Sequence, residues 1–224
     1  MRKRTGLIRL VVLISILIFG IASAQAGLSI GEVVSYYSPR FGEVNDKLEW
    51  VSALSEMDLK LKGGLACGLT LSYDTSPNFR IRGEHNTFTS KTSDSSSYDL
   101  WEDDYSFKLT TTPIILSGIY RFSPDSLLCP YAGAGIGYFF TKISDEWKGY
   151  YEGEMWNTES YSDKDNPIGY QILGGIEFRG ENFSLAMEAR YIIAKANLND
   201  PSAGFNTKVD LGGLFAGLIA STKF

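Results

Sequence analysis

Histidine and cysteine are scarce in this sequence. Its 224 residues include one histidine, His85, and two cysteines, Cys67 and Cys129. No Cys-x-x-Cys pair or Cys/His cluster is present, so a zinc site is not expected. A catalytic triad needs a histidine between a nucleophile and an acid, and the surroundings of His85 in the sequence do not supply this arrangement. We therefore expect no metal, no cofactor and no catalytic residue.

Basic residues are fewer than acidic ones in this sequence, and four of them lie in the N-terminal segment of residues 1–26. This segment opens with four basic side chains, continues with an apolar run over residues 10–19 and ends in small residues over 22–26. That layout is typical of a cleaved secretory signal peptide. The apolar run is too short to span a bilayer well as a retained anchor, so we predict cleavage after Ala26 and a single mature domain over residues 27–224.

Positive charge is in deficit beyond this leader, and long hydrophobic runs are missing. Without the leader, 17 basic side chains face 26 acidic ones, a net charge of about −9, and such an acidic chain is not expected to bind nucleic acid. No later stretch reaches the roughly 18 apolar residues of a membrane-spanning helix. Secretion permits a disulfide, but Cys67 and Cys129 fall on segments that are not expected to be neighbours, so two free thiols are predicted.

What the sequence has instead is an alternation of apolar and polar residues with period two. Between residues 59 and 73, five leucines, Cys67 and Tyr73 take the odd positions other than Gly63, whereas lysine, glycine, alanine, threonine and serine take the even ones. A strand sorts residues onto two faces in this way and a helix does not. Eight such strands are predicted, over residues 28–38, 59–73, 79–84, 114–122, 130–140, 168–179, 183–191 and 208–224.

The connections between these strands alternate in length. Short turns fall at residues 74–77, 123–128 and 180–182, and long polar segments at 39–57, 92–104, 144–167 and 196–207. Short turns at one end and long loops at the other are typical of membrane β-barrels. The sequence therefore predicts an all-β fold, an eight-stranded antiparallel up-and-down transmembrane β-barrel.

The two faces of the strands are assigned from their lengths and aromatic residues. Six strands carry five to seven apolar residues on one face, enough to cross a bilayer, and aromatic residues gather at the strand ends, as in interfacial girdles. The apolar face, which includes His85 near an external loop, is therefore expected to point outward. The opposite face lines a narrow lumen in which charges must pair. We predict a charge network in its periplasmic half, formed by Arg80, Arg82, Glu84, Arg121, Glu177, Arg179, Glu188 and Arg190.

The segment PYAGAGIGYFF at residues 130–140 has three glycines, Gly133, Gly135 and Gly137, at two-residue intervals. A dinucleotide-binding loop requires a third glycine where Tyr138 stands and a helix afterwards, and a phosphate loop requires a Lys-Ser or Lys-Thr pair. Neither is present. The glycines are instead expected to form a stripe of small residues on the lumen side, leaving room for arginine and glutamate side chains from other strands.

Two of the long connections have distinctive compositions. Residues 144–166 contain seven carboxylates interleaved with five tryptophans and tyrosines. This composition is consistent with a solvated loop whose aromatic residues extend the hairpin above the membrane, or with a surface that contacts an extracellular ligand or a divalent cation. In residues 39–57, apolar residues recur at helical spacing. This connection is expected to be either a short amphipathic helix over the barrel mouth or an irregular loop.

These segments resemble the small outer-membrane β-barrels of the OmpA/OmpX/OmpW type. The resemblance covers roughly residues 28–224 and is carried by TTTPIILSGIYRF, PYAGAGIGYFF, GGIEFRGENFSLAMEARYI and the terminal Phe224. It implies that Phe224 acts as the C-terminal aromatic residue in recognition by the barrel-assembly machinery. Thr222 departs from the pattern, since a larger apolar residue is expected at its position. The family shares no catalytic residues, so no active site is carried over.

The resemblance leaves several functions open. We expect a non-enzymatic protein of the bacterial outer membrane, in contact with its lipid, with a structural or surface-interaction role. The alternatives are a narrow, porin-like channel or conduit for small hydrophobic solutes and, third, a soluble lipocalin-like binding barrel of the periplasm. A ligand, if there is one, is expected at residues 144–166.

Overall fold

In a computed structural model, which describes residues 27–55, 57–200 and 205–224, eight strands close into an antiparallel ring. Each strand pairs with the next around the ring, and the last strand closes on the first. This confirms the predicted eight-stranded up-and-down barrel. The predicted signal peptide lies outside the described residues. In ring order the strands are β1 (Leu28–Pro39), β2 (Gly64–Asp74), β3 (Phe79–Tyr98), β4 (Trp101–Arg121), β5 (Leu128–Tyr151), β7 (Ile168–Arg179), β8 (Phe183–Ile193) and β11 (Gly213–Lys223).

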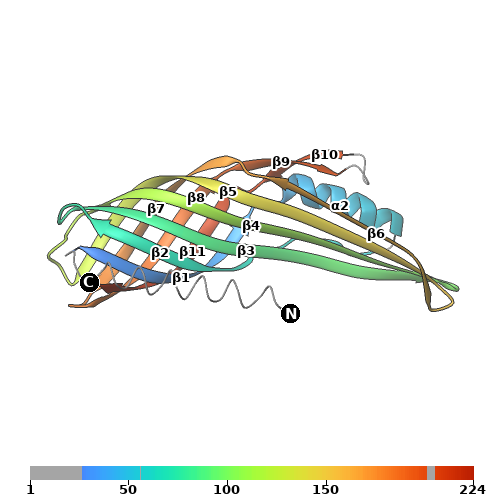
Figure 1. The fold of residues 1–224 in the computed structure, drawn as a ribbon, viewed down its shortest axis with the longest axis horizontal. Coiled ribbons are helices and arrows are strands. Elements are labelled where there is room, and N and C mark those ends of the chain that lie inside the picture. Colours follow the sequence, from blue (N-terminus) through green and yellow to red (C-terminus); the bar gives the residue numbers. More distant parts are fainter. Residues whose placement is uncertain (1–26, 56, 201–204) are drawn as a thin grey trace, which may run out of the picture.

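Three of the ring strands continue far beyond the rim of the barrel. With β6 (Glu154–Asp165), strands β3, β4 and β5 form a four-stranded antiparallel extension that projects from one end (Figure 1). The long polar connections over residues 92–104 and 144–167 are therefore not irregular loops, and the expected extension of the hairpin over residues 144–166 is confirmed. Both segments are hairpins with two-residue turns, and Asp99, Glu152 and Gly153 take the positive φ that such turns use. Serine and charged residues with scattered aromatic residues occupy both faces of these strands, so the alternation on which the strand prediction depended is missing.

The remaining described elements fold over the same end of the barrel. Helix α2 (Gly42–Ser55) confirms the helical alternative for the first long connection, and it packs inward through Val44 and Leu48, both buried. Strands β9 (Lys195–Asp200) and β10 (Phe205–Asp210) form a hairpin. The predicted strand over residues 208–224 is thus divided, because its first residues belong to β10 and the ring strand begins at Gly213. Among the described residues, no helix has the length and hydrophobicity needed to cross a bilayer.

The start of the second predicted strand is also corrected. Leu59 and Leu61 were placed on the outward face with Leu65, but the ring strand β2 begins only at Gly64. Leu59 and Leu61 are buried inside, whereas Leu65 is 69% exposed. The alternation changes phase at the glycine pair over residues 63–64, so residues of the same parity point to opposite sides before and after it.

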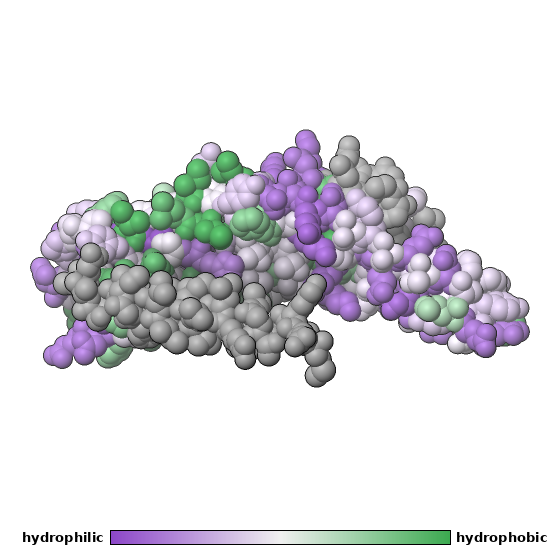
Figure 2. Space-filling model, in the orientation of Figure 1, coloured by the Kyte–Doolittle hydropathy of each residue, from purple (hydrophilic) through white to green (hydrophobic). Residues whose placement is uncertain are grey.

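The outer surface of the ring is apolar, as the alternation predicts. Leu65, Ile172 and Met187 are 69%, 62% and 64% exposed, and they belong to bands of exposed aliphatic and aromatic residues that run around the strands. Figure 2 shows hydrophobic surface over the barrel and hydrophilic surface towards the extension. Soluble monomers rarely expose contiguous apolar surface on this scale, so the outward band is suited to lipid.

Candidate functional site

The predicted lumen residues lie together in one half of the barrel, the half that contains the short turns. At the end nearest those turns, Arg80 donates to Asp74 (2.7 Å) and to Glu177 (2.9 Å). Arg121 donates to the same Asp74 at 2.8 Å. Arg179 lies near Glu177 at 3.8 Å and also donates to a backbone carbonyl. This layer joins β2, β3, β4 and β7.

A second layer of charges lies deeper in the lumen. Glu188 accepts from Arg82 and lies within 2.8 Å of both Arg82 and Arg190. Glu84 is paired with Arg190 and lies 3.3 Å from Arg82. The side chains of all four residues are at most 4% exposed. Buried charges are tolerated when each is paired and hydrogen-bonded, and here two arginines and two glutamates neutralise one another across β3 and β8.

Three further side chains complete this network and are not among the eight residues predicted for it. Asp74 binds two arginines, the Tyr131 hydroxyl donates to Glu188 at 2.9 Å, and the Gln171 amide donates to Ser117 at 2.9 Å and to Glu84 at 3.4 Å. The odd or even position of Asp74 and of Tyr131 along its strand could have placed it on the lumen face. Asp74 continues the inward series of β2, and Tyr131 has the parity of the three glycines that follow it.

The polar layers leave little empty space. They enclose a cavity of about 10 Å³, lined by residues that include Arg82, Tyr131 and Ser184. This volume corresponds to about one water molecule. Side chains therefore fill this half of the lumen, as expected of an eight-stranded barrel.

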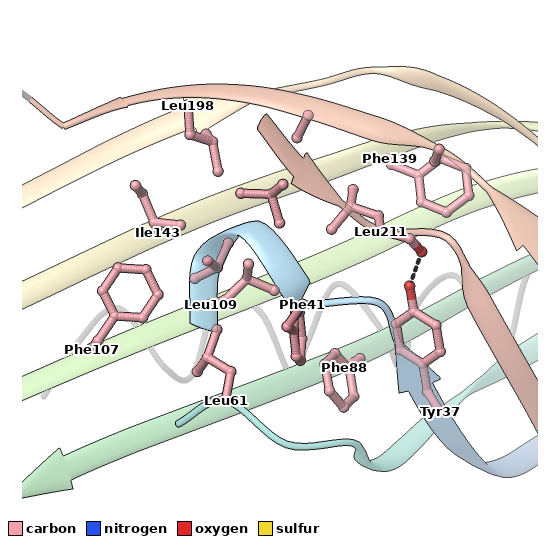
Figure 3. Close-up of a cluster of buried hydrophobic side chains, with 14 of the residues drawn as sticks. Tyr37, Phe41, Leu61, Phe88, Phe107, Leu109, Phe139, Ile143, Leu198 and Leu211 are labelled. Carbon is pink, nitrogen blue, oxygen red and sulfur yellow. Dashed lines mark hydrogen bonds between the residues drawn. The ribbon is translucent and has the colours of Figure 1, made fainter. Parts of the chain in front are cut away.

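The other half of the interior is apolar, which the sequence did not predict. Phe88, Leu109 and Phe139 point inward from the ring strands and pack around the residues of α2 and of the segment that follows it (Figure 3). Phe215 of β11 is buried in the same cluster. The Tyr37 ring stacks on Phe215 at 3.9 Å, and its hydroxyl donates to the carbonyl of Leu211. We call this cluster the apolar plug; it comprises Tyr37, Phe41, Val44, Leu48, Met57, Leu59, Leu61, Ala66, Phe88, Phe107, Leu109, Ile115, Phe139, Ile143, Ile192, Ala194, Ala196, Leu198, Val209, Leu211 and Phe215.

The glycine stripe faces the lumen, but its surroundings differ from the prediction. A Cβ added at Gly133 would lie 2.5 Å from the carbonyl oxygen of Gly118, and one added at Gly137 would lie 2.5 Å from the side chain of Ile115. At Gly135 the nearest atoms belong to Ser117 and to its neighbours in β4. The stripe is therefore occupied by the adjacent strand β4 rather than by arginine and glutamate side chains from across the lumen.

The tip of the extension gathers aromatic residues from both long hairpins. Trp101 lies 4.8 Å from Tyr151 and 5.6 Å from Trp156, and Trp147 lies 5.9 Å from Trp156, measured between ring centroids. We call these four residues the tip cluster. Trp101 and Trp156 are 47% and 54% exposed. The two hairpin turns beside this cluster and the first residues of the strands that follow them carry carboxylates, namely Asp99, Glu102, Glu152 and Glu154.

The extension is also fixed to the segment that follows α2. The Asp94 carboxylate accepts the backbone N–H of Asp58 at 2.7 Å and that of Ser95 at 2.9 Å. These hydrogen bonds favour the charged form and hold the pKa of Asp94 below its ordinary value. An open polar groove of about 400 Å³ passes Asp94 and is lined by residues of both charges. Among the described residues, no cluster of three metal-ligating side chains is found.

The remaining predicted residues lie at the surface and at the chain end. His85 points outward from β3, where Ile114 and Leu69 flank it. Cys67 is exposed and Cys129 is buried, and both thiols are free, as predicted. The backbone N–H of Phe224 donates to the carbonyl of Leu28 at 2.9 Å, at the seam where the ring closes.

Comparison with known proteins identifies the architecture. No protein-family model matches the sequence, and no curated protein matches it. Among solved structures, Neisserial surface protein A (NspA) is similar at 15% identity with a TM-score of 0.55, and the match covers 89% of this chain and 98% of NspA. The outer membrane protein OprG from Pseudomonas aeruginosa is similar at 14% identity with a TM-score of 0.51, over 89% of this chain and 98% of OprG. The chain therefore has the fold of the small eight-stranded outer-membrane β-barrels.

Proposed function

We propose that this protein is a non-enzymatic barrel of the bacterial outer membrane that holds a rigid β-extension outside the cell, with the tip cluster as its binding surface. The observation that carries the proposal is the pairing of a filled barrel with an exposed acidic, aromatic tip. A barrel filled by a charge network and an apolar plug is a stable base. Among the described residues, the surface of the extension is the one that lies farthest from the barrel (Figure 1).

The outer surface supports a membrane location. Lys142 follows Phe140, a residue of the exposed apolar band, on the same face of β5, and it pairs across strands with Lys164 on β6. Lys91 lies opposite Lys108 on the neighbouring strands β3 and β4. Exposed lysines that border an apolar band are suited to the polar headgroups at a bilayer surface. The extension begins at this level and rises into the aqueous phase.

The interior weighs against the conduit alternative. Two layers of paired charges leave a cavity of about 10 Å³ in one half, and the apolar plug occupies the other. A solute path would require displacement of α2 together with several ion pairs. The same filled interior weighs against a lipocalin-like binding barrel, which needs a ligand cavity.

The chemistry of the tip indicates the class of ligand. Indole and phenol faces attract cations, and the carboxylates beside the tip cluster add a negative field. The tip is therefore suited to a ligand that presents amine or guanidinium groups, such as a basic peptide segment. Screening in water keeps the contribution of each exposed charge small, so we expect affinity to come mainly from contact with the aromatic rings.

A titration of tryptophan fluorescence tests this proposal. Full-length protein in nonionic detergent is titrated with a tetra-arginine peptide and, separately, with a tetra-glutamate peptide. We expect saturable binding of the arginine peptide alone, and its loss in Trp156→Ala. Trp50→Ala, which removes an exposed tryptophan of α2, is the matched control and should bind as the unmodified protein does. Equal binding of both peptides, or unchanged binding by Trp156→Ala, would contradict the proposal.

A further inference from the structure

Two ionisable side chains interrupt the apolar band of the barrel wall. Along the band, the outward positions of the described ring strands are almost all aliphatic, aromatic or small, but Glu32 of β1 and His85 of β3 both point outward and are exposed. A carboxylate or imidazole that faces hydrocarbon is costly and is usually retained for a partner. Among the described residues, no ion pair or hydrogen bond of either side chain is found.

The register of the sheet places these two residues in one row. Glu32 is the cross-strand partner of Leu69, and Leu69 is in turn the partner of His85. Strands β1, β2 and β3 lie side by side in the barrel wall (Figure 1). Neighbouring strands are about 4.8 Å apart, so Glu32 and His85 lie roughly 10 Å from each other, one on each side of Leu69.

The nearest outward neighbours offer no counter-charge. Glu32 lies between Leu69 and Ala220, and His85 lies between Leu69 and Ile114. Along their own strands, the flanking outward residues are uncharged as well. An opposite charge for each of these side chains must therefore come from outside the chain.

We infer that this wall is the interface of a symmetric dimer in which Glu32 of each copy pairs with His85 of the other. The inference rests on the proposed membrane location. Consider two copies in the same orientation, related by a two-fold axis along the membrane normal. Leu69 of one copy then faces Leu69 of the other, and left and right exchange across the interface, so each Glu32 lies on the same side as a His85. Because barrel strands tilt by about 35–45°, the two residues of a pair differ in height by roughly 6 Å, which two extended side chains can bridge. An isologous interface of this kind forms two equivalent Glu32–His85 pairs, one on each side of the axis.

The energetics favour the pairing inside a membrane. Hydrogen bonds between charged groups are short and strong, and they gain further in a medium of low dielectric constant. Apolar contacts alone give little drive to association, because lipid tails are as apolar as the leucines they cover. The reciprocal Glu32–His85 pairs would therefore supply both the affinity and the choice of this wall over the others.

Cys67 provides a probe of the interface within the native sequence. It is exposed, shares the outward face of β2 with Leu69 and lies two residues away from it. Cys129 is buried and does not compete for a reagent. Protein inserted in phosphatidylcholine vesicles is treated with a short bismaleimide, and covalent dimer is measured against protein-to-lipid ratio. We expect dimer in the unmodified protein and none in Cys67→Ser.

A charge swap tests the pairing itself. His85→Glu places two carboxylates together at each contact and should weaken dimerisation at least about tenfold, as should Glu32→Gln. The double variant Glu32→His/His85→Glu restores complementarity and should dimerise as the unmodified protein does. Ile172→Ala, on β7 across the barrel, is the control that should change nothing.

Each outcome has one meaning. Single variants that still cross-link fully, a swap that fails to restore the dimer, or inserted protein that never forms a dimer would overturn the inference and leave the membrane barrel intact. Heat-modifiable migration shows whether each variant is folded, and Glu32→Gln keeps the size of the side chain should His85→Glu fail to fold. Unmodified protein that does not insert at all would instead overturn the membrane location on which the inference rests.

Discussion

A guanidinium nitrogen of Arg82 lies 2.8 Å from a carboxylate oxygen of Glu188, and the two side chains reach each other across the lumen from β3 and β8. These residues are 106 positions apart in the chain. Their side chains are 4% and 1% exposed. The pair therefore forms only when the ring is closed, and it ties distant walls of the barrel together at its centre.

Reversal of the charge at Glu188 is predicted to destabilise the barrel strongly. Glu188→Lys would place a third cation beside Arg82 and Arg190 in a site closed to water. Breaking a buried pair in this way costs about 3–5 kcal/mol. The measurement is the denaturant midpoint of the barrel in detergent. The control is Glu154→Lys on the exposed extension, for which we expect a change within about 0.5 kcal/mol. Equal midpoints for the two variants would show that the network does not hold the barrel together.

The glycine stripe yields a second prediction. Gly135→Leu would push a side chain into Ser117 and the backbone of β4, and such overpacking costs roughly 1–3 kcal/mol. Ala134→Leu, the adjacent residue on the outward face of β5, would place the same side chain against lipid and should leave the unfolding midpoint nearly unchanged. If Gly135→Leu were as stable as Ala134→Leu, the small residues would be incidental to the packing of β5 on β4.

The apolar plug yields a third prediction. Leu48 of α2 is buried in it, so Leu48→Ala should cost about 2–5 kcal/mol locally. Hydrogen exchange is expected to rise over residues 42–55 while the ring strands stay protected. Glu49→Ala, on the exposed side of the same helix, is the control. Faster exchange in the ring rather than in α2 would mean that the plug is part of the barrel's own core.

A fourth prediction concerns the pH dependence of the contact between Asp94 and the backbone of Asp58. The pKa of Asp94 is lowered in the folded protein. Its contribution is therefore fully present above the ordinary pKa of an aspartate and is lost as pH falls through the lowered value. The protection factor of the Asp58 amide, which is its exchange rate relative to that of an unstructured chain at the same pH, should fall under acid conditions. Asp94→Asn should show a low protection factor already at neutral pH, with little further change. If the protection of the Asp58 amide changed neither with pH nor in Asp94→Asn, the proposed contact between the Asp94 carboxylate and this amide would be refuted.

Much of the barrel was predictable because its strands alternate strictly. In β7 and β8, apolar residues alternate with polar and charged ones. Because successive side chains of a strand point to opposite faces, the apolar residues must share one face and the arginines and glutamates the other. The short turns and the ring of eight strands were predictable for the same reason.

The sequence did not predict the apolar plug, and it predicted the extension only in part, as a solvated loop over residues 144–166 whose aromatic residues extend the hairpin. Beyond residue 90, both faces of β3 are exposed to water. Serine, threonine, lysine and aspartate occupy both faces, so no alternation of apolar and polar residues remains. In the outer half of the lumen, Phe88 points inward between two outward-facing threonines and Leu109 between Lys108 and Thr110, so the apolar face is the inner one. Ile115 points inward between Ile114 and Leu116, so both faces are apolar there. Alternation therefore does not show which apolar residues line the lumen, and the glycines at residues 63–64 add a change of phase. The tip cluster depends on the register between two hairpins that composition alone does not fix.

The measurement that tests the central claim most directly is heat-modifiable migration of the protein from fractionated cells. A closed membrane barrel held by a buried charge network resists detergent until it is boiled, so unboiled and boiled samples should migrate differently. We expect the protein in the outer-membrane fraction, with a clear shift in its migration on boiling. Protein recovered from the soluble periplasm, with no shift on boiling, would contradict the account.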